Sequence, residues 1–328
     1  MKAKAVVFTG KREVEVREID VPELAEDQVL IDVTYSWISI GTESSFLKQE
    51  RIAGDAAYKP GDPPPFPQVP GYQKVGVVRA LGSNVNGLEI GDNVFATVSE
   101  VEGMMFPYGG HVSPAVTYVS QVWKLPEGAS PIAYSGMVLA QVGYNCGIKP
   151  PVQPGDLAVV IGDGLVGHWA AQTLLQRGAN VIVLGRHDKR LSLLPDGVRG
   201  INTRHIDISD GLGSQEHNVQ IVVDTVAAMD TFEAIRPLMK HGSHLVSAGF
   251  HGENGYIHIP TIRGQEITLH CPSGWEKTRM DAALRGIHEG WLQTEPLITH
   301  IVDVAQARDV WDMILNKQEF CLGVVLKW

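Results

Sequence analysis

A glycine-rich turn between two apolar runs is the feature that most limits how this chain can fold. Residues 157–161 are apolar and rich in β-branched side chains, as in a buried parallel strand. The pattern GDGLVG follows at residues 162–167, then a helical pattern over 165–177, and then a second apolar run at 181–184. This order predicts a strand–helix–strand unit with the glycines at its first turn.

Each glycine of this turn has its own expected role. Gly162 permits the tight turn, Gly164 lets a pyrophosphate approach the backbone, and Gly167 lets helix and strand pack closely. The helix N-terminus offers backbone N–H groups to the phosphates. We therefore predict a dinucleotide site, the alternative being a tight turn with no ligand. The residues expected to contact the cofactor here are Gly162, Gly164, Leu165, Val166 and Gly167.

The end of the second predicted strand indicates which dinucleotide binds. NAD enzymes of this fold place Asp or Glu there to accept a hydrogen bond from the ribose 2′-hydroxyl, whereas this chain has Gly185. Glycine leaves room for a 2′-phosphate and arginine can bind one through two hydrogen bonds, so NADP(H) is favoured over NAD(H). The expected contacts are Gly185, Arg186, His187 and Arg190; for Arg190 and Lys189 the alternative is an exposed helix start.

Alternating strand and helix patterns continue after this unit and predict a parallel, doubly wound sheet. The strands are expected at residues 198–202, 219–224, 244–248 and 267–271, with a helix at 230–240. Ligands of open α/β sheets bind at the carboxyl ends of the strands. That rule adds five expected cofactor contacts, namely Thr225, Ala248, Gly249, Phe250 and Cys271.

The first 125 residues read differently, as short strands separated by turns, so a β-rich domain is expected to precede the nucleotide domain. A helix is expected at 44–51 and another at 132–146, while the Pro- and Gly-dense residues 54–70 cannot form a regular element. Two helices, at 279–289 and 304–316, and a last strand at 323–327 complete the chain.

The composition of the chain limits the kinds of partner that we expect. The chain of 328 residues has a net charge of −10 and no basic block, which argues against nucleic acid and anionic membranes as partners. We recognise no signal peptide and no membrane span. Cys146, Cys271 and Cys321 are far apart and odd in number, so we expect no disulfide framework and a reducing, cytoplasmic setting.

Several short motifs along the whole chain resemble the medium-chain dehydrogenase/reductase superfamily, of the zinc alcohol dehydrogenase type. They are Ile40–Glu43, Gly71–Gln73, Gly91–Val94, Gly109–Gly110, Lys124–Gly128 and the glycine turn. The resemblance implies an α/β fold with a GroES-like β-rich catalytic domain (residues 1–138 and 272–328) and a Rossmann domain (139–271). It also implies a nicotinamide-dependent oxidoreductase that forms a homodimer or homotetramer.

One branch of this superfamily is more similar than the others. The segments Ser39–Glu43, Pro64–Pro67, Val69–Tyr72, Leu297–His300 and Cys321–Trp328 resemble the bacteriochlorophyllide a dehydrogenase group. That resemblance implies an enzyme that handles the hydroxyethyl side chain of a chlorin.

The ligands of the superfamily's zinc ions are missing. Ile40 stands at the first cysteine, Tyr72 at the histidine, Gln73 at the glutamate and Met137 near the third ligand. Isoleucine cannot bind zinc, and a phenol and a thioether are poor replacements for imidazole and thiolate. Residues 93–118 contain no cysteine, so the structural zinc also lacks its ligands. We expect no zinc at either site.

Without zinc, the charge on the substrate oxygen must be met by hydrogen-bond donors or a general base. Thr42 matches the family's proton-relaying hydroxyl, with helix capping as the alternative. Tyr72 is expected to donate a proton, helped by a cation that lowers its pKa, or simply to fill the metal's space. Glu43 is expected to lie beside the site, and a role as general base is the less favoured alternative. Lys74 would share a face with Tyr72, although such lysines are usually solvated.

Three functions remain open. The first is zinc-free hydride transfer between NADP(H) and an alcohol/carbonyl pair. The second is reduction of a C=C bond or a quinone, which does not require Thr42, and the third is a dinucleotide-binding protein without catalysis. Most other histidines are expected to have surface or capping roles, and His111 stays unassigned. The other histidines considered are His168, His205, His217, His241, His251, His258 and His288.

Overall fold

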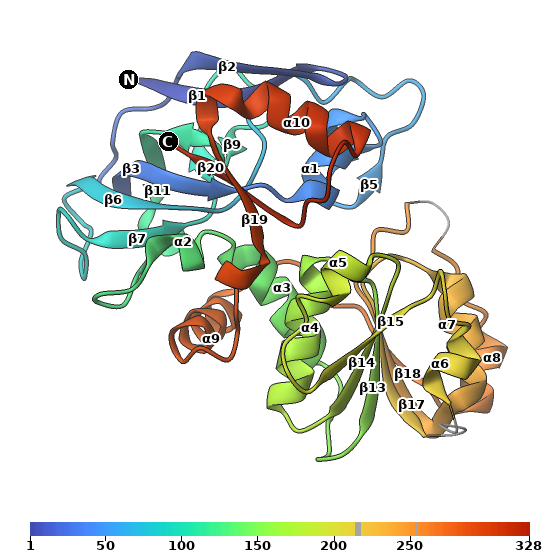
Figure 1. The fold of residues 1–328 in the computed structure, drawn as a ribbon. Helices are drawn as coiled ribbons and strands as arrows, with labels where there is room; N and C mark the ends of the chain where they lie inside the picture. The colour runs from blue at the N-terminus through green and yellow to red at the C-terminus, as the bar shows by residue number, and fades with distance from the viewer. Residues whose placement is uncertain (214–217, 253–254) are drawn as a thin grey trace. The chain divides into compact units, whose positions relative to one another are not determined.

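The computed structural model describes residues 1–213, 218–252 and 255–328. It divides into two compact units, shown in Figure 1: Met1–Val138 with Thr294–Trp328, and Leu139–Gln293. The sequence-based boundary at residue 272 differs from this division. Residues 272–293 belong to the second unit, in which the backbone carbonyl of Gln293 accepts a 2.9 Å hydrogen bond from the Trp169 indole.

The second unit is built on a six-stranded sheet, which confirms the expected Rossmann architecture. Its strand order is β15-β14-β13-β16-β17-β18, and each neighbouring pair is parallel. The strands are β13 (Leu157–Ile161), β14 (Asn180–Gly185), β15 (Val198–Asn202), β16 (Val219–Asp224), β17 (Met239–Ser247) and β18 (Thr268–His270).

Helices cover both faces of this sheet (Figure 1). On β13, Ala158 and Val160 contact the core shared with α3 and α4, whereas Val159 and Ile161 contact the core shared with α6, α7 and α8. Strands buried on both faces explain the continuous apolar run. The helices in this part of the chain, not all of which cover the sheet, are α3 (Met137–Ile148), α4 (Leu165–Gln176), α5 (Asp188–Leu191), α6 (Ile208–Leu212), α7 (Met229–Ile235), α8 (Ile259–Gly264) and α9 (Lys277–His288).

The first unit is mainly antiparallel and confirms the expected β-rich domain. Its larger sheet has the order β12-β7-β6-β3-β20-β19, with β11 also paired to β3, and a smaller sheet has the order β10-β1-β2. Strand β20 at the end of the chain pairs with β3 and so returns residues 294–328 to this unit. The strands are β1 (Lys2–Gly10), β2 (Glu13–Asp20), β3 (Gln28–Trp37), β6 (Lys74–Leu81), β7 (Asn93–Ala96), β10 (Val112–Ser113), β11 (Ala115–Tyr118), β12 (Val122–Lys124), β19 (Ile298–Asp303) and β20 (Gly323–Lys327).

Shorter elements complete the first unit. The hairpins pair β4 (Arg51–Ala53) with β5 (Ala56–Ala57) and β8 (Ser99–Glu100) with β9 (Tyr108–Gly109). The helices are α1 (Ile40–Leu47), α2 (Pro131–Tyr134) and α10 (Ala307–Asn316). Within the described part of the chain, no helix combines the length and the apolar character needed to cross a membrane.

Three predicted helices were wrong in extent. The helix expected at 44–51 is α1, which begins at Ile40 and ends before β4. The helix expected at 132–146 is broken between α2 and α3, where a Cβ on Gly136 would approach the Trp37 ring to 2.8 Å. The helix expected at 230–240 ends at Ile235, because a 3₁₀ turn containing Pro237 follows and β17 begins at Met239.

Candidate functional site

The glycine turn between β13 and α4 has the geometry expected of a phosphate-binding loop. Gly162 has φ of 117°, a region that glycine readily adopts, and a Cβ on Gly167 would lie 2.0 Å from the Gly162 carbonyl oxygen. A Cβ on Gly164 would meet nothing within 4 Å, so this backbone faces open space. Gly162 and Gly167 are therefore required for packing, while Gly164 leaves room beside the turn.

The N-terminus of α4 opens directly onto this turn. The helix begins at Leu165 and Val166, with Gly164 as its N-cap, and none of the described side chains caps it. The first N–H groups of a helix have no partner within the helix and favour an anion. This end of α4 can therefore receive the phosphates of a dinucleotide.

Asp163, inside the glycine turn, fills the space beside Gly185. Its Oδ2 accepts hydrogen bonds from the backbone N–H groups of Arg186 at 2.7 Å and His187 at 2.9 Å. A Cβ on Gly185 would lie 2.6 Å from Asp163 Cβ and Oδ2. The space that the sequence assigned to a 2′-phosphate at Gly185 thus holds a carboxylate, which corrects that reason for the glycine.

The other contacts of Asp163 join the β14–α5 turn to the glycine turn. His187 Nδ1 lies 2.9 Å from Oδ2, and Arg190 Nη1 lies 3.4 Å from Oδ1. Burial acts to raise the pKa of Asp163, but the N–H of Arg186, the His187 imidazole and Arg190 outweigh it and lower the pKa. His187 and Arg190 are thereby held inward by the carboxylate.

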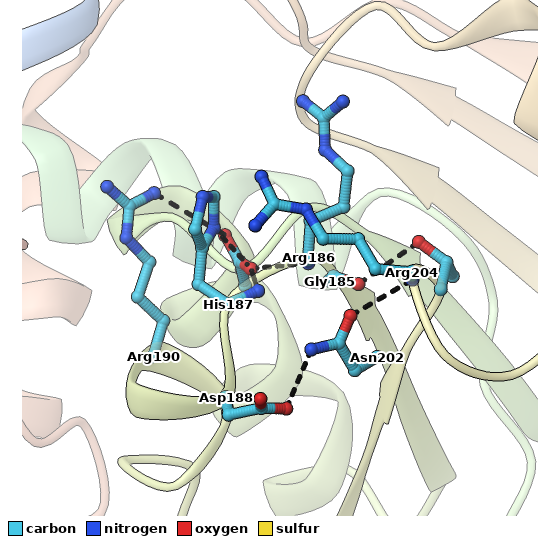
Figure 2. A network of polar contacts seen from close by, with 9 residues as sticks. Gly185, Arg186, His187, Asp188, Arg190, Asn202 and Arg204 are labelled. Carbon is cyan, nitrogen blue, oxygen red and sulfur yellow. Dashed lines mark hydrogen bonds and ion pairs between the residues drawn. The ribbon is translucent and has the colours of Figure 1, made fainter. Parts of the chain in front are cut away.

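Arg186 and Arg204 supply exposed positive charge at the ends of β14 and β15. Gly185 and Asn202 are register partners, and the Thr203 N–H donates to the Gly185 carbonyl at 2.9 Å. These bonds bring the turn with Arg204 next to the turn with Arg186 (Figure 2). Among the residues that the structure describes, neither guanidinium group has a hydrogen-bond or ion-pair partner.

The remaining expected cofactor contacts lie at the carboxyl ends of parallel strands. Thr225 follows β16, and its hydroxyl donates to the Ile161 carbonyl at 2.9 Å. A Cβ on Gly249 would lie 2.1 Å from the Ala227 nitrogen, so the turns after β16 and β17 pack closely. Ala248 and Phe250 flank Gly249; Ala248 is partly exposed and Phe250 is exposed. Cys271 follows β18 and is also exposed.

In the first unit, the structure brings Tyr72 and Thr42 together. The Tyr72 hydroxyl donates to Ser39 Oγ at 2.6 Å, and the Thr42 side chain hydrogen-bonds the same phenol. Thr42 lies within α1 rather than at its cap. Tyr72 therefore faces a pair of hydroxyl groups at the start of α1.

Burial raises the pKa of Tyr72 to about 12, which corrects the expectation of a lowered value. The hydrogen bonds of Tyr72 with Ser39 and Thr42 oppose that rise, and Glu43 adds to it. Arg51, on β4, is a cation that lowers this pKa, but its effect is the smallest of these. The phenol therefore stays protonated at neutral pH and acts as a donor.

Glu43 is held by two buried groups. Its Oε1 accepts from the Ser39 backbone N–H at 2.7 Å, and its Oε2 lies 2.9 Å from His111 Nε2. Glu43 is 2% exposed and His111 is 0% exposed. His111 was unassigned from the sequence because it lies 68 residues from its partner.

Lys74 is buried rather than solvated, contrary to the usual behaviour of lysine. It is 0% exposed, and its Nζ donates to the Thr97 carbonyl at 2.6 Å. Burial lowers the pKa of Lys74 to about 7. The lysine of this strand is therefore a buried amine that can lose its proton near neutral pH.

The positions of the family's zinc ligands hold side chains that do not fit a metal. Ile40 packs against the apolar core near α10, and Met137 is fully buried. Tyr72 binds Ser39, and the Gln73 amide donates to the Trp37 carbonyl at 3.4 Å. Residues 1–213, 218–252 and 255–328 contain no group of three or more His, Cys, Asp or Glu able to hold a metal.

Sequence reasoning missed several residues of these two clusters. Ser39 and His111 become visible only through long-range contacts, and Arg204 only through the pairing of β14 with β15. Asp163 lies inside the glycine motif that the sequence showed, but the direction of its side chain depends on the conformation of the turn. His168 is buried within α4, and burial lowers its pKa to about 4, whereas His217 lies outside the described residues.

Comparison with known proteins finds similar dehydrogenases and a matching domain family. The family model of the alcohol dehydrogenase GroES-like domain matches residues 25–127. The 2-desacetyl-2-hydroxyethyl bacteriochlorophyllide A dehydrogenase of Rhodobacter capsulatus is 22% identical over 341 residues, covering 100% of this chain and 99% of that protein.

Two solved structures share the fold over the whole chain. A short chain alcohol dehydrogenase of Escherichia coli CFT073, complexed with NADH, has a TM-score of 0.84 at 20% identity and covers 100% of this chain and 99% of its own. A protein of Sinorhizobium meliloti 1021 described as a zinc-binding dehydrogenase, bound to NADP, has a TM-score of 0.82 at 18% identity and full coverage of both chains. Residues 25–127 thus match the alcohol dehydrogenase GroES-like domain, and the whole chain is similar in sequence and fold to dehydrogenases of the medium-chain dehydrogenase/reductase superfamily.

Proposed function

We propose that this protein is a zinc-independent, NADP(H)-dependent oxidoreductase that transfers hydride between the nicotinamide and an alcohol/carbonyl substrate. The observation that carries the proposal is the phenol of Tyr72, which stands at the position of a zinc ligand and stays protonated. It hydrogen-bonds Ser39 and Thr42, so three hydroxyl groups meet at one point.

The bound nicotinamide would supply or accept the hydride. The chain's own task is to bind the substrate oxygen and move a proton to or from it. The phenol of Tyr72 is protonated at neutral pH and can donate its hydrogen to the oxygen of a carbonyl that is being reduced. Thr42 and Ser39 can replace the donated proton through their hydroxyl groups, while Glu43 lies behind them as a buried carboxylate.

The preference for NADP(H) rests on the charges of the β14 and β15 turns. Asp163 is a negative charge at this place, but its Oδ2 already accepts hydrogen bonds from the N–H groups of Arg186 and His187. Arg186 and Arg204 are exposed and can bind a 2′-phosphate. The two similar structures contain NADH and NADP respectively, so the choice depends on this chain's own residues.

The substrate is a small alcohol or carbonyl compound with an apolar part. Phe46 and Phe106 have ring centroids 6.1 Å apart, and the Arg51 guanidinium lies 5.8 Å from the Phe46 ring centre, in the part of the first unit that also holds Tyr72. A homodimer or homotetramer, and a cytoplasmic location, complete the proposal. These two points follow from the family resemblance and from the three scattered cysteines.

A binding and activity experiment tests the proposal. We expect NADPH to bind, metal analysis to find no stoichiometric zinc, and a chelator to leave activity with a ketone panel unchanged. Tyr72→Phe should lower kcat by about 10²- to 10⁴-fold without changing the Kd for NADPH. Protein that binds no nicotinamide nucleotide contradicts the proposal.

Other outcomes favour the rival functions. Tight NADPH binding without turnover indicates a non-catalytic protein. Reduction of quinones or C=C bonds that is unaffected by Tyr72→Phe indicates the second class of chemistry, because that reaction needs no donor at a carbonyl oxygen.

A further inference from the structure

A buried hydrogen-bond chain runs from the C-terminal residue to the start of α1. The Trp328 indole donates to Ser36 Oγ at 2.8 Å, and Ser36 Oγ lies 2.8 Å from His111 Nδ1. His111 Nε2 lies 2.9 Å from Glu43 Oε2, and Glu43 Oε1 accepts from Ser39 at 2.7 Å. Both imidazole nitrogens and both carboxylate oxygens therefore have partners.

One arrangement of protons satisfies each of these contacts. Ser36 accepts from Trp328 and donates its own hydroxyl hydrogen to His111 Nδ1. The imidazole then donates the hydrogen on its Nε2 to Glu43 Oε2. Buried polar groups that are fully paired in this way hold a single geometry.

His111 also contacts the segment that carries Tyr72. Its backbone N–H donates to the Pro70 carbonyl at 3.0 Å. Gly71 has φ of 86°, and a Cβ on Gly71 would lie 2.8 Å from His111 Nε2. One imidazole thus lies against the residue before Tyr72 and binds the residue after Thr42.

We propose that His111 is a positioning residue that holds Glu43 and the turn at Gly71 so that Tyr72 meets Ser39 and Thr42. The role rests on the proposed function of Tyr72 as the proton donor. The titratable and charged groups that act on this phenol are Glu43, from α1, and Arg51, from β4. His111 acts on Tyr72 by holding Glu43, which in turn binds the backbone of Ser39.

Two conservative variants separate the contacts of His111. The amide nitrogen of glutamine stands near the place of Nε2, so His111→Gln can keep the bond to Glu43. The amide of asparagine stands near Nδ1, so His111→Asn keeps the bond to Ser36 and leaves the buried Glu43 oxygen without its donor. An exposed histidine, in His258→Asn, is the matched control.

The first measurement is the ionisation of Tyr72, followed by ultraviolet absorbance and taken as the difference from the same protein carrying Tyr72→Phe. The hydrogen bonds of Tyr72 with Ser39 and Thr42 act to lower its pKa, so a variant that loses this arrangement should show a further rise. We expect His111→Asn to raise the pKa of Tyr72, and His111→Gln and the control to leave it unchanged. This measurement needs no substrate, so it tests the positioning role even if the proposed activity is absent.

The second measurement is the steady-state rate with NADPH and a carbonyl substrate. His111→Asn should lower kcat by about tenfold or more, with the Kd for NADPH unchanged, and His111→Gln should restore most of the loss. Adding Glu43→Gln to His111→Asn should cost little more, because both changes act through one contact. A His111→Asn protein whose melting temperature falls while the Tyr72 pKa and kcat stay unchanged overturns the proposal.

Discussion

The side chain of Asp163 lies in the space that any side chain at residue 185 would enter. A Cβ on Gly185 comes within 2.6 Å of both the Cβ and the Oδ2 of Asp163. The carboxylate cannot withdraw easily, because it accepts hydrogen bonds from the N–H groups of Arg186 and His187. The end of β14 therefore needs glycine because the aspartate of the glycine turn occupies the space of a side chain there.

The Gly185→Ala variant tests this relationship. We expect it to lower the free energy of unfolding by about 1–3 kcal/mol, because an added methyl group in a filled space forces neighbouring atoms to move. Denaturant unfolding at neutral pH measures the change.

The double variant Gly185→Ala with Asp163→Ala is the control for this clash. Its loss of stability should be smaller than the sum of the two single losses, since the methyl group then meets no carboxylate. Strict additivity would show that the two side chains do not compete for one space.

Gly164→Ala should separate binding from stability. The backbone at Gly164 has φ of −84° and ψ of 176°, which any residue adopts, and a Cβ there meets no atom within 4 Å. Stability should therefore stay within about 0.5 kcal/mol of the original. The affinity for both NADPH and NADH should fall by about tenfold or more, because the methyl group enters the space that the pyrophosphate needs.

Calorimetric titration with each nucleotide checks the effect of Gly164→Ala. Gly264→Ala is the matched control, since its Cβ also enters open space but lies at the end of α8. Unchanged affinity in Gly164→Ala would place the phosphates away from this turn.

Arg186→Ala and Arg204→Ala should each weaken NADPH binding and leave NADH binding unchanged. A hydrogen bond to a charged group contributes about 1.5–3 kcal/mol, so each loss corresponds to about a tenfold to hundredfold rise in the Kd for NADPH. Arg199→Ala, an exposed arginine within β15, is the control. Equal losses for NADH and NADPH would show that these arginines do not read the 2′-phosphate.

The sequence predicted the features that depend on neighbouring residues. Strand β13, the glycine turn, α4 and the end of β14 at Gly185 follow from apolar runs and glycine spacing over about 30 residues, and the structure confirms these elements. The doubly wound order follows from the alternation of strands and helices, because parallel strands need a crossover between them.

The features that depend on distant contacts could not be predicted. The bond between Glu43 and His111 joins residues 68 apart, and the close approach of Gly136 to the Trp37 ring joins residues far apart in the sequence. The burial of Lys74 contradicts the usual cost of burying a charge, so no local rule predicts it. Strand β19 mixes partly buried and exposed residues without a clear period, and pairing with β20 defines it.

The buried amine of Lys74 should make stability depend on pH in the alkaline range. The unfolded chain protonates this lysine with a pKa near 10.5, whereas the folded chain does so only near pH 7. Between these values the unfolded state binds one more proton, so the free energy of unfolding rises by about 1.4 kcal/mol per pH unit from this group. The contribution is complete above pH 10.5 and is lost as pH falls through 7.

Lys74→Met removes this effect while keeping an unbranched side chain of similar length. We expect the variant to be more stable than the original protein by a few kcal/mol at pH 6–7, with the difference shrinking steadily towards pH 10. Urea unfolding at several pH values measures it, and Lys11→Met, at an exposed turn after β1, is the control that should show no such trend. A stability difference that is constant across this range would mean that the folded protein does not lower the pKa of Lys74, and that its amine keeps its proton inside the β-rich unit.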